Sequence, residues 1–356
     1  MKPIRLGVVG CGAIAQIQHL PNLATLPDEF TVTCLCDASR SLAEAVAARF
    51  HVPRAVSDYR ELLASDVEAV LLCHTDPKTE VALAALAAGK HLLIEKPVCW
   101  SLEEADALIE AASRAGVVAQ TAYMKVYDPA FDLARSAVAR LRNPRFVQIQ
   151  HFHTDNRHHL ARFRLLRGGE PDPAAREANR QARAVAVRQA IGEVPAEVEG
   201  AFFRLAGSLI HDLYTLRHLV GPATRVLHTD LWHDGWGIHT LLEHAGGLRT
   251  AATWVELFDV RDFKETIEVC ADNGRVRLSY PTGFARGILS TLHLQELDGE
   301  GNPVGRTPAI EWESPFVCEL REFHRCIRTG AQPRTPLEEA RLDVELIIAI
   351  TRRALA

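Results

Sequence analysis

The stretch GVVGCGAIA, residues 7–15, decides the fold of the N-terminal part of the chain. It sets the pattern Gly10-x-Gly12-x-x-Ala15 between an apolar strand-like run and a helix-like run. The first glycine permits a tight turn, the second lets backbone amides approach a pyrophosphate at a helix N-terminus, and Ala15 still allows the helix to pack closely on the strand. A bare tight turn is the alternative, but the position at the first strand of a β-α-β pattern predicts a dinucleotide-binding loop.

Continuous apolar runs, separated by helix-like segments, follow one another through the first third of the chain. Strands that are apolar on both faces are typical of a parallel sheet covered by helices on both sides. The runs are IRLGVVG at 4–10, FTVTCLCD at 30–37, AVLLCHT at 69–75, HLLIEKP at 91–97 and VVAQTAYM at 117–124. We therefore expect an α/β fold that begins with a doubly wound parallel sheet, the Rossmann arrangement.

The pattern changes near residue 123. The segments RFVQIQHFHTD (145–155), RTAATWVELF (249–258) and TIEVCADNGRVRLSY (266–280) alternate between apolar and polar residues, as half-exposed strands do. The third segment contains an Asp-Asn-Gly sequence typical of a hairpin turn. This pattern predicts strands that pair in antiparallel fashion.

The expected division is a Rossmann domain at 1–122 and an α+β domain at 123–356 with an open, mainly antiparallel sheet. The second domain includes a helical insertion at about 157–206 and a C-terminal helix at about 335–355. In the first domain, Ser101 with Glu104 predicts a capping box that starts a helix.

Bulk composition limits the classes of function. The chain has 356 residues and a net charge of −5, which gives no electrostatic reason to expect a nucleic-acid partner. No apolar run is long enough for a membrane span, and the start is strand-like rather than a secretory signal, so we expect no membrane partner and a cytoplasmic location. The eight cysteines are scattered without a CxxC pair, which favours buried free thiols over disulfides or a zinc cage.

Asp37 at the end of the second apolar run bears on the choice of cofactor. A carboxylate there accepts hydrogen bonds from ribose hydroxyls and repels a 2′-phosphate, which favours NAD over NADP. Arg40 is the counter-argument, because a guanidinium could hold a 2′-phosphate and make NADP possible. Asp37 as a plain cap for the helix at Ser41 is the structural alternative.

The stretch LLIEKPVCW, residues 92–100, places a lysine at the end of a buried strand in a chain with only six lysines. In a doubly wound sheet, ligands bind beyond the carboxyl ends of the strands. Lys96 lies at such an end and is followed by Pro97, so its ammonium could act on a substrate hydroxyl or carbonyl next to a nicotinamide. A surface lysine paired with Glu95 is the alternative.

Four segments in this order resemble the glucose–fructose oxidoreductase/inositol dehydrogenase (Gfo/Idh/MocA) family. They are Gly10–Ala15, GKHLLIEKP at 89–97, AYMKVYDPAF at 122–131 and SLIHDLYTLRHLVG at 208–221. The resemblance covers nearly the whole chain except 157–200. It implies a Rossmann domain followed by an open-sheet domain whose outer face often forms oligomer contacts, here a homo-oligomer (dimer or tetramer). It also implies NAD(P)-dependent hydride transfer at a hydroxyl-bearing carbon of a sugar, cyclitol or derivative.

The same resemblance implies residue roles. Lys96 would be the motif lysine beside the nicotinamide, and His211 would act as acid or base on the reacting hydroxyl. Lys125, Tyr127 and Tyr214 are the expected substrate contacts, and no metal is expected. The expected cofactor-binding residues are Gly10, Gly12, Ala13, Ile14, Asp37, Arg40, His74, Thr75, Glu95, Lys96 and Pro97.

Two positions depart from the family pattern. The dehydrogenases commonly have an aspartate four residues before the histidine, where this chain has Gly207, and many have one three residues after it, where this chain has Tyr214. His211 therefore lacks its usual carboxylate partner, unless Asp212 or a residue from elsewhere takes that role.

Other groups of residues have weaker interpretations. His151 and His153 share one face of a strand with Asp155 in line, which would suit a metal, a substrate contact or plain packing. His233 or Trp236 could line a sugar site. The arginine-rich segment 157–206 could be a lid for a phosphate or carboxylate, although its interspersed acidic residues fit a solvated helix face.

Three functions remain open from the sequence. The first is an oxidoreductase that uses NAD(P) for net oxidation or reduction of a CH–OH group. The second is a lyase or glycosidase that uses tightly held NAD for transient oxidation, and the third is a non-catalytic NAD(P)-binding sensor. The missing carboxylate partner of His211 keeps the second and third in consideration.

Overall fold

The computed structural model describes residues 2–75, 77–169 and 173–355 of the chain. They form two compact units, each described by itself. The first unit is Met1–Tyr123, Leu160–Gly192 and Phe316–Val344, and the second is Met124–His159, Glu193–Pro315 and Glu345–Ala356. The expected single boundary after residue 122 differs from this division in the segments 160–192 and 316–344. Both belong to the first unit because residues such as Leu320, Phe323 and Leu166 pack against its apolar core.

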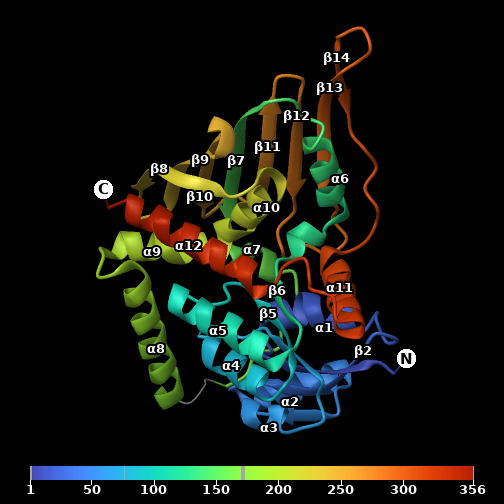
Figure 1. Cartoon of the computed structure of the whole chain (residues 1–356). Helices are drawn as coiled ribbons and strands as arrows, with labels where there is room; N and C mark the ends of the chain where they lie inside the picture. The colour runs from blue at the N-terminus through green and yellow to red at the C-terminus, as the bar shows by residue number, and fades with distance from the viewer. Residues whose placement is uncertain (1, 76, 170–172, 356) are drawn as a thin grey trace. The chain divides into compact units, whose positions relative to one another are not determined.

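The first unit is built on a six-stranded parallel sheet with the strand order β3-β2-β1-β4-β5-β6. Its strands are β1 (Ile4–Val9), β2 (Phe30–Cys36), β3 (Arg54–Val56), β4 (Ala69–Leu72), β5 (His91–Glu95) and β6 (Ala119–Ala122). This order is that of the Rossmann fold, in which ligands bind at the carboxyl ends of the strands where the order reverses. The predicted doubly wound sheet is therefore confirmed, and its strands and helices make up the blue to cyan part of the chain in Figure 1.

The helices of the first unit follow the expected β-α alternation. They are the π-helical turn η1 (Ala15–His19) continued by α1 (Leu20–Leu23), then α2 (Arg40–Phe50), α3 (Tyr59–Leu63), α4 (Thr79–Ala87), α5 (Leu102–Ala115) and α8 (Pro173–Ile191). The predicted capping box is present: Ser101 Oγ accepts from the Glu104 amide at 3.2 Å, and Glu104 accepts from the Ser101 amide at 3.2 Å. Such a box fixes the start of a helix by satisfying two otherwise unpaired amides.

The core of the first unit explains why these runs become strands. Leu6, Val8, Leu35, Leu71 and Leu93 are each at most 1% exposed. Burial of one such side chain contributes about 1.5–3 kcal/mol relative to exposure. The continuous apolar runs are thus buried on both sheet faces, as expected for parallel strands.

The second unit is built on an eight-stranded sheet with the order β14-β13-β12-β11-β7-β10-β9-β8. Its strands are β7 (Pro144–Thr154), β8 (Ala223–Trp232), β9 (Gly237–His244), β10 (Arg249–Leu257), β11 (Lys264–Ala271), β12 (Gly274–Tyr280), β13 (Thr291–Leu297) and β14 (Pro303–Arg306). The neighbours pair antiparallel, with one exception: β7 and β10 run parallel. The predicted Asp-Asn-Gly turn joins β11 to β12. The open, mainly antiparallel sheet is confirmed. The parallel pair β7–β10 joins two of the segments for which the alternating pattern had favoured antiparallel pairing.

Helices cover one face of this sheet. They include η2 (Met124–Tyr127), α6 (Pro129–Val138), α9 (Ala196–Arg204), the π-helical turn η3 (Leu205–Leu209) and α10 (Ile210–Val220), whereas the short turn η4 (Ala245–Gly247) connects β9 to β10. Of these, α6 contacts β12 and β13, α9 contacts β8, and α10 contacts β11. The remaining helices, α7 (Asn156–Leu160), α11 (Pro315–Thr329) and α12 (Leu337–Arg353), contain residues of both units. Figure 1 shows α10 in front of the sheet of the second unit.

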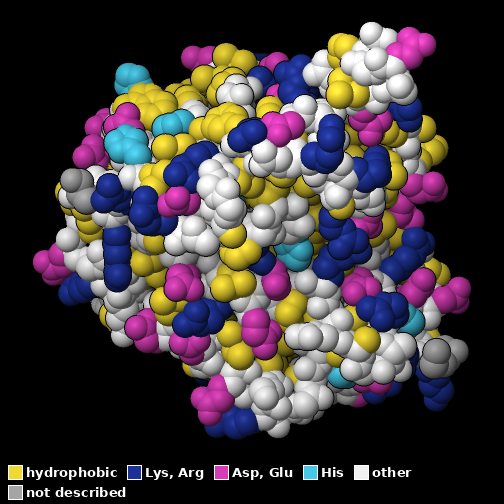
Figure 2. All heavy atoms as spheres, turned by 45° about the horizontal axis from the view of Figure 1, so that its top comes forward, with side chains coloured by type: hydrophobic (Ala, Val, Ile, Leu, Met, Phe, Trp, Pro, Cys, Tyr) yellow, Lys and Arg dark blue, Asp and Glu magenta, His cyan; other side chains and the backbone are white. Residues whose placement is uncertain are grey.

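The other face of the eight-stranded sheet carries polar side chains. A shallow depression on it, of about 200 Å³, is lined by Gln148, Gln150, Lys264, Thr266, Glu268, Arg277, Ser279 and His293. On the molecular face drawn in Figure 2, acidic and basic side chains are interspersed among apolar ones. Within the described residues, no helix is both long and apolar enough to cross a membrane.

Candidate functional site

The glycine loop between β1 and η1 has the geometry of a phosphate-binding turn. Gly10 has a φ of +97°, and a Cβ there would overlap the backbone of His74. Gly12 is exposed, and a Cβ on it would meet no atom within 4 Å, so this glycine borders open space at the first turn of the helix. Ala13 and Ile14, which open that turn, are only partly buried. A helix start with an open approach to its amides fits the pyrophosphate of a dinucleotide.

Asp37 lies directly after β2 and is fixed beside the glycine loop. Its carboxylate accepts from the Cys11 amide at 2.8 Å and from the Ser39 amide at 2.9 Å. These bonds leave lone pairs for further donors such as ribose hydroxyls. Ser39, not Asp37, is the N-cap residue of α2, so the plain capping interpretation of Asp37 is wrong. Arg40 is exposed and bonds Glu44 at 2.9 Å.

The residues around Lys96 form a charged turn at the carboxyl end of β5. Glu95 is buried and accepts from His19 Nε2 at 2.8 Å and from the Lys96 amide at 3.1 Å. Burial alone would raise the pKa of Glu95, but the bond and charge of His19, followed by the charges of Lys96 and Lys78, bring it below its ordinary value. Glu95 is therefore a buried structural carboxylate rather than one half of a surface pair. Lys96 itself is partly exposed.

A second buried lysine, which the sequence analysis missed, holds this turn. Lys78 is 4% exposed and donates from Nζ to the carbonyl oxygen of Pro97 at 3.0 Å. Burial and then the charge of Lys78 lower the pKa of His74 to about 4, so that imidazole is neutral. In the sequence, a lysine just before a helix-like run resembles an ordinary exposed residue. The rarity of lysine in this chain was therefore the signal that could have marked Lys78. Thr75 is exposed.

The segment 164–169 of the arginine-rich region packs on the dinucleotide loop. The side-chain amide of Gln16 donates to the Leu166 carbonyl at 3.0 Å and accepts from the Leu166 amide at 2.9 Å. Arg49 of α2 donates to the Arg164 carbonyl at 2.7 Å. Farther along, Gly168 lies so close to Ser39 that a Cβ would overlap its hydroxyl. This segment therefore covers the helix that starts at the glycine loop and the start of α2.

The arginine side chains of this region are mostly solvated. Arg157, Arg162, Arg164, Arg167, Arg176, Arg180, Arg183 and Arg188 are all exposed. Arg180 bonds Glu177 at 2.7 Å, and Arg157 bonds Asp155 at 2.6 Å. These contacts match the solvated-face interpretation; recognition of an anion by a lid stays a prediction.

In the second unit, His211 lies in the first turn of α10 and is partly buried. Its Nδ1 is 2.9 Å from the hydroxyl of Tyr214, which also accepts from the Lys125 amide at 3.3 Å. The residue that replaces one missing aspartate thus supplies a neutral partner for His211. Asp212, the alternative partner considered above, instead bonds His151 at 2.6 Å, so that assignment is wrong. Gly207 is exposed, and a Cβ there would meet no atom within 4 Å.

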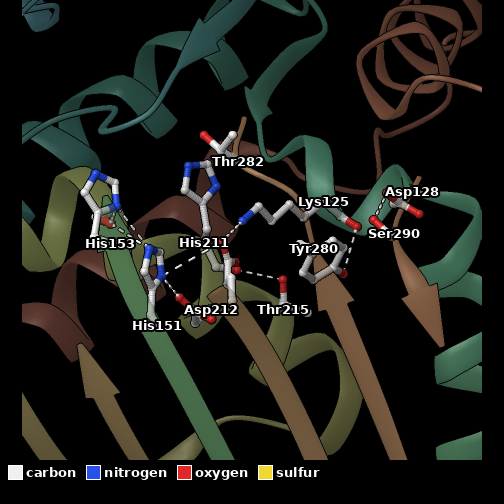
Figure 3. Close-up of polar contacts among 12 residues, drawn as sticks. Lys125, Asp128, His151, His153, His211, Asp212, Thr215, Tyr280, Thr282 and Ser290 are labelled. Atoms are coloured by element: carbon white, nitrogen blue, oxygen red, sulfur yellow. Dashed lines mark hydrogen bonds and ion pairs between the residues drawn. The ribbon is translucent and has the colours of Figure 1, made fainter. Parts of the chain in front are cut away.

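Figure 3 shows a buried charged cluster next to His211. Lys125 forms an ion pair with Glu265, whose carboxylate lies 3.9 Å from His151 Nδ1, and His151 in turn bonds Asp212. Each of these four side chains is at most 2% exposed. Burial raises the pKa of Asp212 to about 7 and is also the main reason that the pKa of Glu265 is raised.

This cluster bears on two expectations. Lys125 and Tyr127 were expected beside the substrate. The ammonium of Lys125 is engaged with Glu265 inside the unit and Tyr127 is 5% exposed, and a substrate contact by either residue stays a prediction. His151, Asp212 and Glu265 offer possible metal-ligand atoms within 4.8 Å of one another. The ammonium of Lys125 already supplies the cation that this acidic pocket requires. Asp155, the third residue of the metal interpretation, bonds Arg157 instead.

His153 is the partly buried neighbour of this cluster. Its ring stacks on Trp254 at a centroid distance of 5.7 Å, and its Nδ1 is 3.2 Å from His151 Nε2 and 3.3 Å from Ser208 Oγ. The period-two spacing of His151 and His153 predicted their common face correctly. Ser208 and Trp254 were missed, because only the three-dimensional fold brings η3 and β10 to this strand.

The strand–turn–strand predicted for LWHDGWGIH is confirmed as β8 and β9. His233 lies in the turn with a φ of +50°. Trp236 packs edge to face with Phe258 at 5.0 Å and lies under the Arg204 guanidinium at 3.6 Å. These contacts are aromatic packing, and a role in sugar binding stays a prediction.

The fold and the glycine loop together define a dinucleotide-binding α/β chain with a second, sheet-based unit. The family model described as "Oxidoreductase family, NAD-binding Rossmann fold" (GFO_IDH_MocA) matches residues 4–123. Inositol 2-dehydrogenase of Paracoccus denitrificans (strain Pd 1222) is 36% identical over 143 residues. The scyllo-inositol 2-dehydrogenase (NAD(+)) of Bacillus subtilis (strain 168) is 23% identical over 366 residues, covering 98% of this chain and 93% of that protein. Residues 4–123 thus match the NAD-binding Rossmann part of the Gfo/Idh/MocA oxidoreductase family.

The relatives of 30% identity or more match less than half of the chain and span less than half of their own length. The match to the Paracoccus protein spans 39% of this chain and 42% of that protein, and the match to the uncharacterized oxidoreductase YrbE of Bacillus subtilis (strain 168), 30% identical, spans 38% and 40%.

Solved structures share the whole fold. Levoglucosan dehydrogenase in complex with NADH and L-sorbose superposes with a TM-score of 0.78 at 17% identity, covering 100% of this chain and 97% of that one. A 3-ketoreductase from Actinomadura kijaniata in complex with TDP-benzene and NADP gives 0.73 at 20% identity, covering 99% and 98%.

Proposed function

We propose that this protein is an NAD-dependent oxidoreductase that transfers hydride between nicotinamide and a hydroxyl-bearing carbon of a sugar, cyclitol or derivative. The observation that carries the proposal is the glycine loop with Asp37 fixed at its side. The names of the inositol dehydrogenase relatives support a polyhydroxylated substrate.

The choice of NAD over NADP rests on charge. A carboxylate at the end of the second strand of this fold accepts hydrogen bonds from the ribose diol and disfavours a 2′-phosphate, and we assign this role to Asp37. Arg40, the residue that would attract such a phosphate, is paired with Glu44. We therefore expect tighter binding of NAD(H) than of NADP(H).

The proposed chemistry uses two basic side chains. A bound nicotinamide supplies the hydride acceptor or donor. Lys96 is the proposed donor to the reacting oxygen, and His211 is the proposed acid or base, oriented by the Tyr214 hydroxyl. Removal of a general acid–base group costs about 10²–10⁴-fold in turnover.

The test is a panel of inositols, hexoses and sugar acids, scored by formation of reduced cofactor. Lys96→Met should lower kcat by about 10²–10⁴-fold while the affinity for NAD is retained. Lys90→Met is the matched control, because Lys90 lies in the same unit and donates to the Val67 carbonyl at 2.8 Å. Parent-like turnover of Lys96→Met on a true substrate would remove Lys96 from the reaction.

A matched pair of changes tests His211. His211→Ala should abolish most turnover and leave NAD affinity unchanged, since His211 and its partner Tyr214 belong to the second unit and the glycine loop to the first. Gly207→Asp places a carboxylate in open space four residues before His211. It should raise the pH at which the histidine loses its proton and shift the pH–rate profile upward. An unshifted profile in Gly207→Asp, together with parent-like turnover in His211→Ala, would assign the proton transfer to other residues.

One observation favours a second candidate function. The segment 164–169 covers the helix that follows the glycine loop, as its two bonds with Gln16 show. A segment held this close to the glycine loop would slow cofactor dissociation if it also contacted the bound cofactor, which suits transient oxidation with regeneration of NAD in place. Turnover of a glycoside without net formation of NADH, with cofactor that survives gel filtration, would favour this candidate over the first.

We also propose a homo-oligomer formed through the open polar face of the eight-stranded sheet. Arg277 and Glu268 on this face offer charges of both signs to a second copy. Arg277→Glu should lower the mass measured by light scattering to that of a smaller assembly. An unchanged mass in this variant, or a monomeric parent, would contradict the proposal.

A further inference from the structure

The side chains between Trp254 and Asp212 form a continuous chain of hydrogen bonds. Trp254 Nε1 can only donate, and it donates to Ser208 Oγ at 2.9 Å. The Ser208 hydroxyl must then direct its own hydrogen toward one of two ring nitrogens, His151 Nε2 at 3.2 Å or His153 Nδ1 at 3.3 Å. Ser208 is therefore a switchable link between the two histidines.

The inner end of this chain is the charged cluster. Lys125 and Glu265 carry opposite charges and cancel one another. His151 and Asp212, whose atoms are 2.6 Å apart, remain neutral as a pair only while they share one proton. A net charge buried at this position costs free energy, so the pair favours the state that holds the proton. The Nε2 atom of His151 lies within reach of the Ser208 hydroxyl, which can deliver or remove that proton.

The outer end of the chain is His153. It is partly buried, whereas His151 is 1% exposed. Phe263 packs edge-on against both rings, at 5.3 Å from His151 and 5.8 Å from His153, and so keeps the chain of bonds in apolar surroundings. Ser208 lies three residues before His211 on the continuous helical run η3–α10, so His153 lies on the same side as His211.

We propose that His151 and Asp212 are a proton store for the reaction, and that Ser208 and His153 connect this store to the substrate side. The inference rests on the proposed oxidoreductase function, which must move one proton for each hydride. It also gives a physical account of the departures at Gly207 and Tyr214, because the carboxylate of the proposed proton path is Asp212, which bonds His151.

The proton transfers balance as follows. When the substrate hydroxyl is oxidised, its proton binds His153 Nε2, and the proton on His153 Nδ1 passes to Ser208 Oγ. The original Ser208 hydroxyl proton passes to His151 Nε2, so that His151 becomes cationic beside the Asp212 carboxylate. The hydride leaves with the cofactor, and reduction runs the same transfers in reverse.

The store should change its state near neutral pH. Burial raises the pKa of Asp212 to about 7, and the charge of Lys125 acts against this shift. Above that pH the pair has lost its proton and can accept one, which favours oxidation; below it the pair holds the proton and favours reduction. The titratable and charged groups that face the pair are Lys125, His153, Glu265 and Tyr280, with His211 on the adjoining helical turn.

The first test needs no substrate. Imidazole nitrogen shifts of the ¹⁵N-histidine protein, followed by NMR between pH 5 and 9, should show His151 and His153 titrating together, with assignments from His151→Gln and His153→Gln. Asp212→Asn should lower the shared midpoint by about one unit or more, because a carboxylate in contact stabilises an imidazolium by that amount. Ser208→Ala should separate the two midpoints, and it keeps the proposal testable if Asp212→Asn does not fold.

A matched control lies on another strand of the same sheet. His239 bonds the Thr253 hydroxyl at 2.9 Å, and His239→Gln should leave the midpoints of His151 and His153 unchanged. Identical midpoints in the parent, Asp212→Asn and Ser208→Ala would overturn the proposal.

The second test uses turnover on a substrate found in the panel. Ser208→Ala should lower kcat for oxidation by about tenfold or more, and Asp212→Asn should remove the limb of its pH profile near neutrality. If the parent enzyme is active but Ser208→Ala and Asp212→Asn show neither effect, the proposed proton store is refuted and the proposed oxidoreductase function stands. If His151 and His153 titrate together by NMR but the protein oxidises no member of the panel, the proton store is supported and the oxidoreductase function is refuted.

Discussion

Removal of the ammonium of Lys125 should destabilise the second unit strongly. The Lys125 and Glu265 side chains are 2% and 0% exposed, so Lys125→Met leaves the Glu265 carboxylate buried without its cation. Loss of one partner of a buried pair costs about 3–5 kcal/mol. Against a total stability of about 5–15 kcal/mol, this is a large fraction.

The unfolding free energy lost in Lys125→Met should depend on pH, and the protonation of Glu265 decides the direction of this dependence. Burial, followed by the charge of Asp212, already raises the pKa of Glu265, while Lys125 and His151 oppose the shift. Without Lys125, the folded-state pKa rises further above the unfolded value. When the pKa of a carboxyl group is higher in the folded state than in the unfolded state, the unfolding free energy of the protein falls as pH increases from the unfolded-state pKa to the folded-state pKa. The destabilisation of Lys125→Met should thus be larger at pH 8 than at pH 5.5.

Urea unfolding followed by circular dichroism at both pH values measures this effect. Lys264→Met is the matched control, because Lys264 is exposed and adjacent to Glu265 in the sequence. The double variant Lys125→Met/Glu265→Gln should recover most of the loss, since it removes both charges. A loss in Lys125→Met no larger than that in Lys264→Met, at either pH, would refute the argument from the buried ion pair.

Further predictions concern the first unit. Asp37→Ala should narrow the preference for NAD(H) over NADP(H), measured as the ratio of the two dissociation constants; equal affinities in the parent would already contradict the role of Asp37. Gly10→Ala should weaken NAD binding by tenfold or more and destabilise the fold by about 1–3 kcal/mol, because φ is +97° and the new Cβ meets the backbone of His74. Lys78→Met removes the buried donor of the Pro97 carbonyl and should lower the unfolding free energy by about 1.5–3 kcal/mol. A change within 0.5 kcal/mol, roughly the scale of an ordinary surface substitution, would show that Lys78 does not hold the turn.

The Rossmann sheet could be predicted from the sequence because its signals are local. The continuous apolar runs, the glycine loop at Gly10 and the capping box at Ser101 each depend on neighbouring residues alone. The strand β3 was missed because its three residues, Arg54–Val56, are too few to show a period. The assignment of α11 to the first unit could not be predicted either, since it depends on packing of Leu320 and Phe323 against strands far away in the sequence.

The candidate site was predictable only in part. The face shared by His151 and His153 follows from the two-residue period of a strand. The partners of His151 do not, because Asp212 and Glu265 lie 61 and 114 positions away and no local pattern connects them. The ion pair of Lys125 was missed for the same reason, because it spans 140 positions of the sequence. Long-range pairs between buried charges are specified by the fold, not by a local pattern.

Transfer of a labelled hydride tests the central claim most directly. The protein would be incubated with NAD and a panel of inositols and sugars that carry deuterium on their carbinol carbons, and the cofactor would then be examined by mass spectrometry. The proposed oxidoreductase should produce reduced cofactor that is one deuterium heavier, and Lys96→Met and His211→Ala should produce much less of it than Lys90→Met. If panel members bind but the cofactor gains no deuterium, and the parent and all three variants behave alike, hydride transfer is contradicted. This result would favour a sensor that only binds its ligand.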